Sequence, residues 1–281
     1  AVMKQNIPRV FWAMTAVPVV VLLAIMGAAL AQSPLADAHI HYSHDAWDGL
    51  PPAEAIKVLR KAGLTKAFVS SSSDQGTQML YKEAPDLIVP VLRPYRRRGE
   101  TGTWFRDASV GDMVAKLLAR NKYAGIGELH IFGADVDLPV PRRIVLLAAQ
   151  YGIFLHVHAD ADAVDRIFAQ NPDARVLWAH SGFAAPEAVA AMLGKHENLW
   201  SDLAFRSDHA AAGKVDAQWR KVFLQFPGRF MIGTDTFTPR RWGQVVAHAN
   251  WSRQWLADLP VEVRENIAYR NAENLARWAV R

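Results

Sequence analysis

Histidines in this chain are concentrated where short apolar runs end. Six of its 10 histidines lie at such positions: His39, His41, His130, His156, His158 and His180. Two acidic residues, Glu128 and Asp235, end runs of the same kind. Neutral imidazoles and carboxylates are the ligands that zinc and related divalent ions accept. This pattern indicates a metal site.

His39 and His41 form a His-x-His pair. In a strand, residues i and i+2 point to the same face, so both rings can hold one ion. A buried pair without a metal would need two hydrogen-bonding partners for each ring, which is costly to arrange. The pair is therefore the firmest part of the predicted site.

The other candidates also have structural explanations. Asp235 could cap a helix, although Thr238 and Pro239 already resemble a cap and a first-turn proline. Glu128 could pair with an arginine, and a lone His180 could be an ordinary structural histidine. Their joint occurrence at the ends of five predicted strands favours metal binding, since no structural requirement demands it.

The elements that must position these residues alternate between β-type runs and amphipathic segments. Strands are predicted over residues 35–43, 66–72, 87–95, 123–131, 152–159, 174–180, 199–205 and 229–237. Helices are predicted over residues 52–62, 110–120, 142–150, 161–169, 186–195, 240–256 and 261–278. Eight such strands predict a (β/α)₈ TIM barrel, whose active site lies at the carboxyl ends of the strands. A doubly wound open sheet is the alternative.

The N-terminal residues differ from the rest of the chain. Lys4 and Arg9 precede an uncharged run over residues 10–30, which ends in Ala29-Leu30-Ala31. This order is typical of a signal peptide over residues 1–31, and an uncleaved membrane anchor is the alternative. Removing 31 residues leaves about 250, the size of one TIM-barrel domain over residues 32–281. That domain is then expected to be periplasmic or secreted, or anchored outside the cytoplasm.

Composition narrows the chemistry. The chain has no cysteine, so it has no thiolate nucleophile or ligand, and a metal must bind nitrogen and oxygen atoms. The formal net charge of +5 includes Lys4 and Arg9, and the remainder is too small to indicate nucleic acid. A small-molecule substrate is expected, with any membrane contact made through an uncleaved N-terminal segment.

Candidate substrate-binding residues follow the predicted strands. Arg93 and Arg206 could bind an anionic substrate, because guanidinium groups suit carboxylates and phosphates. The neighbouring triplet Arg96 to Arg98 is better explained as a solvated loop. His130 shares the inward parity of Glu128 and could contact substrate or support a ligand. Several aromatic residues could line the mouth of the pocket or simply pack the loops: Tyr42, Trp47, Phe132, Phe183, Phe237 and Trp242.

The ordered series of motifs resembles the amidohydrolase superfamily, especially its amidohydrolase-2 branch. The motifs are Asp37-Ala-His39-Ile-His41, Gly-Ile-Gly-Glu128, His158-Ala159, Ala179-His180-Ser-Gly and Gly-Thr-Asp235. The resemblance implies that His39, His41 and Asp235 hold a first ion, and that His158 and His180 hold a second or assist the first. Many members carry a carboxylated lysine where this chain has Glu128, which is similar to the bridging glutamate of the TatD-like subgroup. A single-metal site with Glu128 outside the ligand set is the alternative.

The predicted strand over residues 152–159 offers two possible ligands, because His156 and His158 share a face. The choice between them stays open. His158 is preferred because it lies nearer the strand end and matches the family pattern. His156 would then fill the barrel layer below.

The predicted function is hydrolysis of a C–N, C–O or P–O bond by one or two divalent ions, with zinc favoured over manganese or iron. A bound ion can lower the pKa of water from about 15.7 to about 7. Asp235 would accept the proton and return it to the leaving group, as the resemblance also implies. The alternatives are an amidohydrolase-2 type decarboxylase, a non-catalytic metal-dependent binding protein and, with less support, a TatD-like nuclease, which would need a basic groove.

Overall fold

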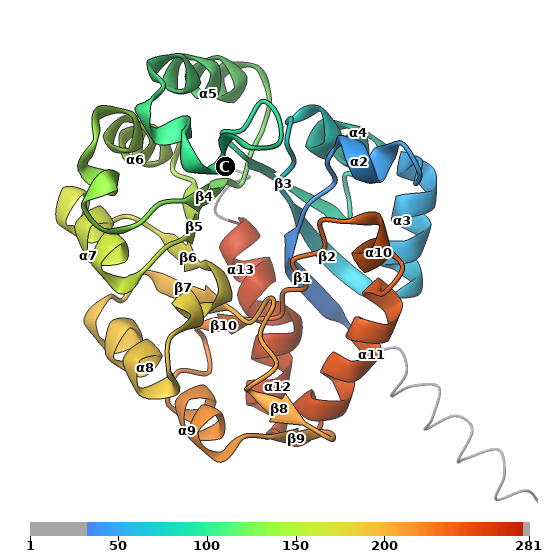
Figure 1. The fold of residues 1–281 in the computed structure, drawn as a ribbon. Coiled ribbons are helices and arrows are strands. Elements are labelled where there is room, and N and C mark those ends of the chain that lie inside the picture. Colours follow the sequence, from blue (N-terminus) through green and yellow to red (C-terminus); the bar gives the residue numbers. More distant parts are fainter. Residues whose placement is uncertain (1–32, 278–281) are drawn as a thin grey trace, which may run out of the picture. The chain divides into compact units, whose positions relative to one another are not determined.

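Eight parallel strands form a barrel in the computed structural model, which describes residues 33–277 (Figure 1). The strands follow one another around the barrel in the order β1 (Leu35–Ile40), β2 (Leu64–Val69), β3 (Ile88–Leu92), β4 (Gly125–His130), β5 (Phe154–His158), β6 (Val176–Trp178), β7 (Leu199–Asp202) and β10 (Phe230–Met231). Backbone hydrogen bonds of 2.8 Å from Ala38 to Ile232 and from Asp235 to His39 join the first and last strands. The predicted closed barrel is confirmed, and the open sheet is excluded.

Helices surround the strands on the outside of the barrel (Figure 1). They are α2 (His44–Trp47), α3 (Pro52–Lys61), α4 (Gln75–Glu83), α5 (Ala108–Arg120), α6 (Pro139–Tyr151), α7 (Ala161–Gln170), α8 (Pro186–Lys195), α9 (Ala217–Gln225), α10 (Pro239–Trp242), α11 (Val245–Leu256) and α12 (Val261–Glu265). A five-residue π-helix, η5 (Asn266–Arg270), links α12 to α13 (Asn271–Arg277). Short 3₁₀ turns are η1 (Glu100–Gly102), η2 (Trp104–Arg106), η3 (Gly133–Asp137) and η4 (Ala179–Phe183), and β8 (Ala210–Ala211) pairs with β9 (Lys214–Val215).

Three helices had no counterpart in the sequence-based prediction: the four-residue α2, α4 and α9. In α9, Trp219, Val222 and Phe223 are buried at helical spacing, so the apolar periodicity was present. In α4, Leu80 is the one large apolar side chain that is buried, and the pattern is correspondingly weak. Most predicted strands also extend beyond the observed ones, because the backbone turns into the loops that carry the site.

The lower half of the barrel is filled by apolar side chains. Phe68 and Phe154 stack there with their ring centroids 5.6 Å apart. Leu275 of α13 packs against the same cluster, and Asn271 donates hydrogen bonds to the carbonyls of Pro227 and Phe230, near the amino end of β10. The helix therefore covers the amino ends of the strands, as its place inside the ring of strands in Figure 1 illustrates. The buried histidines of the barrel strands and the acids Glu128 and Asp202 lie toward the opposite, carboxyl ends of the strands.

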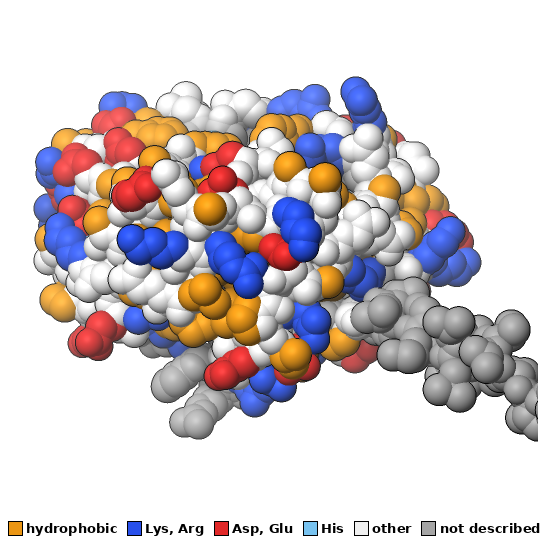
Figure 2. All heavy atoms as spheres, turned by 90° about the horizontal axis from the view of Figure 1, so that it is seen from below, with side chains coloured by type: hydrophobic (Ala, Val, Ile, Leu, Met, Phe, Trp, Pro, Cys, Tyr) orange, Lys and Arg blue, Asp and Glu red, His pale blue; other side chains and the backbone are white. Residues whose placement is uncertain are grey.

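The predicted signal peptide or anchor, residues 1–31, lies outside the described residues. Within residues 33–277, no helix combines the length and the apolar character needed to cross a membrane. The face of the molecule in Figure 2 carries basic and acidic side chains separated by uncharged surface and small hydrophobic patches. Among the described residues on this face, no continuous stripe of Lys and Arg is present.

Gly127 is required by close packing between β4 and β5. Its φ is 147°, and a Cβ at this position would lie 2.1 Å from the carbonyl oxygen of His156. We expect Gly127→Ala to lower the free energy of unfolding by at least about 1–3 kcal/mol, the usual cost of overpacking. Urea unfolding followed by circular dichroism measures it. Gly228→Ala is the control, since a Cβ there would have no neighbour within 4 Å; equal midpoints for the two variants would contradict the expectation.

Candidate metal centre

The His-x-His pair of β1 faces two carboxylates. The Nε2 atoms of His39 and His41 are 3.2 Å apart. Asp235 Oδ1 lies 3.7 Å from the first and 3.2 Å from the second of these nitrogens. Glu128 Oε2 lies 3.5 Å and 3.3 Å from the same two atoms. Strands β1 and β4 and the segment after β10 thus bring four predicted ligands to one point.

The second group meets on the other oxygen of Glu128. His158 Nδ1 lies 2.9 Å from Glu128 Oε1, and His180 Nε2 lies 3.4 Å from it. Glu128 therefore lies between the two groups of nitrogens, with one carboxylate oxygen directed to each. All six predicted ligands are brought together by this arrangement.

Backbone carbonyls fix the orientation of two rings. His41 Nδ1 donates to the carbonyl of Ser70 at 2.7 Å, and His180 Nδ1 donates to the carbonyl of Ala204 at 2.8 Å. A carbonyl oxygen only accepts, so the Nε2 atom of each neutral ring carries a lone pair. Both nitrogens face the carboxylate of Glu128, so the contact is favourable only with a positive charge between them, from a metal ion or from a ring proton. Burial lowers the pKa of His180, but the carboxylates of Glu128 and Asp202 raise it above its ordinary value. The donor set therefore fits a divalent metal ion.

The electrostatics of the cluster lead to the same conclusion. Burial acts to raise the pKa of Asp235, but His39 and His41 outweigh it and hold that pKa at about 2. Glu128 likewise has its pKa held well below its usual range against burial, chiefly by His39. Burial lowers the pKa of His39, but Glu128, Asp202 and Asp235 together raise it well above its ordinary value. The cluster stabilises a positive charge at its centre.

Two ligand candidates lie on strained backbone. His180 has a φ of 57° and Asp235 a φ of 49°, in the left-handed region that non-glycine residues rarely occupy. Such strain persists where the surrounding structure imposes it, and it concentrates at functional sites. Asp235 does not cap the following helix, because Thr238 fills that position by accepting from the backbone N–H of Arg241 at 3.3 Å.

Asp202, at the end of β7, is a residue of the site that sequence reasoning missed. Its Oδ2 accepts from His39 Nδ1 at 3.1 Å and from His156 Nε2 at 2.9 Å. Its Oδ1 accepts from the backbone N–H groups of His180 at 2.9 Å and Ala204 at 3.0 Å. A buried acid at a strand end was a usable signal, because the same rule had selected Glu128 and Asp235.

The contact with Asp202 also distinguishes the roles of the two histidines of β5. His156 packs below His39, with ring centroids 4.4 Å apart, and its Nε2 donates to Asp202. Burial and the adjacent His39 lower the pKa of His156 to about 4, so its ring is neutral. His158, in contrast, contacts Glu128 directly. The geometry favours His158 as the ligand and His156 as its supporting neighbour.

Asp202→Asn is expected to weaken metal binding by about 10–100-fold, the usual effect of losing a partner that orients a ligand. Asparagine carries no negative charge, and its amide nitrogen cannot accept the hydrogen bonds that one oxygen of Asp202 accepts. Competition with a chromophoric chelator measures the affinity. Asp86→Asn is a suitable control, because its exposed carboxylate pairs with Arg60 and contacts no predicted ligand. An unchanged affinity for Asp202→Asn would contradict the orienting role.

Of the predicted substrate-binding residues, Arg93 and His130 lie at the site. Arg93 Nη2 donates to Glu128 Oε2 at 2.9 Å. The arginine pairing that was the structural explanation for Glu128 is therefore present, alongside its contacts with the histidines. The hydroxyl of Tyr95 accepts from the backbone N–H of His130 at 2.8 Å, which leaves its proton for His130 Nδ1 at 3.0 Å. The Nε2–H of His130 then faces Glu128 Oε1, 3.8 Å away. Burial lowers the pKa of His130 to about 3, so the ring is neutral.

Arg206 lies elsewhere. Its Nε and Nη2 donate to the carboxylate of Asp208 at 2.9 Å and 2.6 Å, and its Nη1 donates to the carbonyl of His180 at 3.1 Å. The guanidinium also lies over the ring of Trp219, 4.6 Å from the centroid. It thus reaches the site only through the backbone of His180, where it supports the strained turn.

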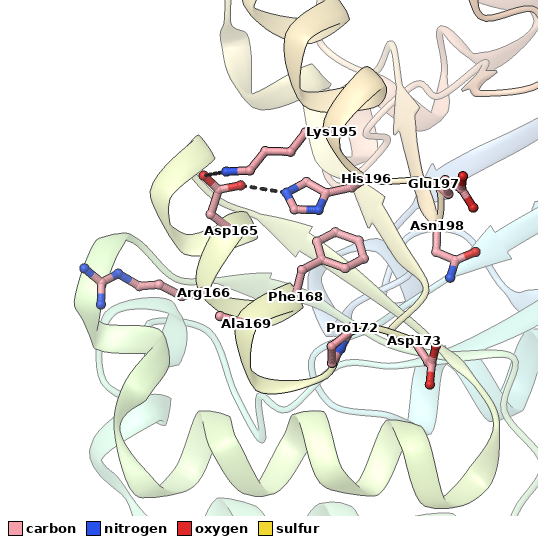
Figure 3. A pocket seen from close by; sticks show the side chains of 10 residues that line it. All are labelled: Asp165, Arg166, Phe168, Ala169, Pro172, Asp173, Lys195, His196, Glu197 and Asn198. Carbon is pink, nitrogen blue, oxygen red and sulfur yellow. Dashed lines mark hydrogen bonds and ion pairs between the residues drawn. The ribbon is translucent and has the colours of Figure 1, made fainter.

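A separate surface pocket of about 680 Å³ lies at the other end of the barrel, between α7 and α8 (Figure 3). It is lined by residues that precede β6 and β7, and so it lies at the amino ends of the strands. Asp165 pairs there with Lys195 and His196 at 2.7 Å and 2.6 Å. His196 also stacks on Phe168, with centroids 4.1 Å apart. These charged groups satisfy one another, which indicates a structural contact between the helices.

Comparisons with solved structures agree with the barrel. An uncharacterised TIM-barrel protein from Bordetella bronchiseptica has a TM-score of 0.53 at 16% identity, covering 80% of this chain and 82% of that chain. A putative 2-pyrone-4,6-dicarboxylic acid hydrolase from Pseudomonas putida has a TM-score of 0.57 at 13% identity, covering 88% and 98%. A TatD-family hydrolase from Entamoeba histolytica has a TM-score of 0.56 at 10% identity, covering 86% and 98%. At these identities the likeness concerns the fold.

The sequence itself carries the family assignment. A search of curated proteins gave no significant match. The family model described as amidohydrolase, of the amidohydrolase-2 type, matches residues 36–278, which include the whole barrel and every candidate ligand. The chain therefore belongs to the amidohydrolase family and is a metal-dependent hydrolase.

Proposed function

We propose that the chain hydrolyses an acyl bond, an ester, lactone or amide, in a small anionic molecule, with a phosphoester as the remaining option. In this proposal His39, His41 and Asp235 would hold one ion, His158 and His180 would hold a second, and Glu128 would serve as a ligand shared by both. The observation that carries it is the convergence of imidazole lone pairs on the carboxylates of Glu128 and Asp235. Nitrogen and oxygen donors of this kind suit zinc, manganese or iron, and zinc is our first choice.

The chemistry follows from the groups around the centre. A divalent ion bound here would activate a water molecule at neutral pH and polarise the bond under attack. Asp235 is ionised at neutral pH, since its pKa is about 2. Its carboxylate accepts the proton of the attacking water and returns it to the leaving group. The neutral His130, with its Nε2–H directed into the site, donates a hydrogen bond to a substrate oxygen.

The anionic character of the substrate is argued from Arg93. Its Nε is buried and has no hydrogen-bond partner among the described residues. Arg93 also lines a pocket of about 310 Å³ together with His44, Asp45 and Arg97, and its contact with Glu128 links this pocket to the metal centre. A carboxylate in this pocket would match the charge of Arg93 and Arg97, because guanidinium groups suit carboxylates. The name of the Pseudomonas putida neighbour, a dicarboxylic acid hydrolase, is consistent with this substrate class.

The test begins with elemental analysis of protein purified without chelator. We expect two equivalents of metal, and less than one equivalent would contradict the proposed site. The protein is then assayed on esters, lactones, amides and phosphoesters, before and after chelation and re-addition of zinc, manganese or iron. Activity that disappears with the metal and returns with it supports the hydrolase.

Two other outcomes would favour the rival functions. Release of carbon dioxide from an anionic substrate would identify a decarboxylase. Full metal content without turnover across the panel would favour a metal-dependent binding protein.

We also propose export of the protein, on the sequence pattern of residues 1–31 alone. In this proposal the signal peptide is cleaved and residues 32–281 act in the periplasm or outside the cell. N-terminal sequencing of protein from the periplasmic fraction tests it. A mature chain that still begins before residue 31 would contradict cleavage and favour the anchored form.

A further inference from the structure

Four exposed phenylalanines lie along one side of the candidate metal centre. Phe132, Phe183, Phe205 and Phe237 are between 39% and 54% exposed. They follow β4, β6, β7 and β10, respectively, so all four lie at the carboxyl ends of the strands. We call these four side chains the phenylalanine rim. Because parallel strands deliver their carboxyl ends to one side of a barrel, the rim and the metal centre share the same mouth.

The rim contacts the proposed ligands directly. The ring of Phe183 stacks on that of His180, with centroids 4.7 Å apart and an interplanar angle of 16°. Phe132 meets the ring of His158 edge to face at 5.9 Å. Phe205 lies 6.4 Å from the ring of His180 and an equal distance from that of Phe237. A molecule bound at the metal centre would therefore touch apolar rings on this side.

Backbone geometry argues against loop packing as the reason for the rim. Phe183 has a φ of 52° and Phe205 a φ of 58°, values that are unfavourable for bulky side chains. Both rings nevertheless remain exposed, so neither position recovers that cost by burying its side chain in the core. Strain held at exposed apolar residues beside a reactive centre is typical of a binding site.

Charge complements the rim on its neighbouring side. Phe237 lines the pocket that also contains Arg93 and Arg97, so the apolar surface continues into a basic one. Arg241 holds Phe205 and Phe237 in place, since its guanidinium lies 4.5 Å and 5.7 Å from their ring centroids and its Nε donates to the carbonyl of Asp235 at 2.7 Å. The site thus offers an apolar wall and a cationic pocket on two sides of one metal centre.

We propose that the phenylalanine rim binds an apolar aryl or alkyl body of the substrate, so that the enzyme acts on amphipathic acids whose anionic group lies in the Arg93 pocket. This inference rests on the proposed function, because it places the scissile bond at the metal. The rim determines specificity and takes no part in the chemical step. Burial of each methylene against it tightens binding by about threefold to fourfold.

Hydroxamic acids provide a test that is independent of the bond hydrolysed, since they chelate divalent metals. Affinities of acetohydroxamate, hexanohydroxamate and octanohydroxamate for the zinc-loaded protein are measured by calorimetry. We expect octanohydroxamate to bind at least about 30-fold more tightly than acetohydroxamate. In a Phe132→Ala/Phe205→Ala double variant, most of this difference should disappear while acetohydroxamate binds as before. Phe183 is left in place because its ring, stacked 4.7 Å from that of His180, makes the closest contact between the rim and a proposed ligand.

The control replaces two exposed leucines on outer helices, Leu146→Ala and Leu224→Ala, which should leave the whole series unchanged. If acetohydroxamate fails to bind zinc-loaded protein, the proposed function fails. If acetohydroxamate binds but chain length has no effect, the rim proposal alone is overturned. An equal loss for all three ligands in the double variant would also overturn it, by showing that the rim merely supports the ligands.

Two further outcomes would assign the rim to a different partner. Cosedimentation of the wild-type protein, but not of the double variant, with phosphatidylcholine vesicles would identify a membrane-binding surface. A dimer that is present in the wild type and lost in the double variant would identify an interface between two copies of the chain. Either result without a chain-length effect would overturn the substrate assignment.

Discussion

Asp235→Asn is expected to lower kcat by about 10²–10⁴-fold, the range typical of losing a general acid–base group. The carboxylate is ionised at neutral pH, with its pKa held at about 2, and lies 3.2 Å from His41 Nε2. Asparagine keeps the shape of the side chain and one oxygen, but it cannot accept a proton. Elemental analysis of the variant should still find bound metal, so that the loss of rate is separated from a loss of the ion.

Asp86→Asn serves as the matched control for this prediction. Asp86 is exposed and pairs with Arg60 at 3.0 Å, so its replacement should leave both kcat and metal content unchanged. An Asp235→Asn enzyme that keeps its full metal content and more than about a tenth of the wild-type kcat would show that another group accepts the proton.

Glu128→Gln is expected to have the largest effect on metal binding. Loss of a partner that only orients a ligand already costs about 10–100-fold in affinity, and we expect at least the upper end of that range for a bridging ligand. The stoichiometry should fall from two equivalents to one or fewer. The metal-free variant should also be destabilised, by up to about 3 kcal/mol, because the partly buried guanidinium of Arg93 loses its charged partner.

Glu100→Gln separates these two effects. Glu100 is also buried and pairs with an arginine, Arg96, at 2.9 Å, but it contacts no predicted ligand. Its replacement should therefore lower stability without changing the metal stoichiometry. If Glu128→Gln retained two equivalents at wild-type affinity, Glu128 would lie outside the ligand set and the single-metal or unbridged alternative would hold.

The fold and the location of the site could be predicted because both depend on local patterns. Alternation of apolar runs with amphipathic segments identified all eight barrel strands, and the parity of His39 and His41 within one strand follows from the period of two. The helix α4 was missed because its apolar pattern is weak, with Leu80 its only large buried apolar residue. Arg206 was expected at the substrate, yet Asp208, two residues away, binds its guanidinium after the strand has ended.

Sequence alone therefore determined which residue types collect at the strand ends, in which order, and that nitrogen and oxygen atoms must supply any metal ligands. Only the tertiary structure decided how those residues are oriented. Asp202 on β7 accepts hydrogen bonds from His39 on β1 and from His156, whereas His158 contacts Glu128. The physical reason is the distance along the chain over which each property is determined. The face to which a side chain points is set within its own strand. The direction of an imidazole nitrogen depends on hydrogen-bond partners from strands that are distant in the sequence.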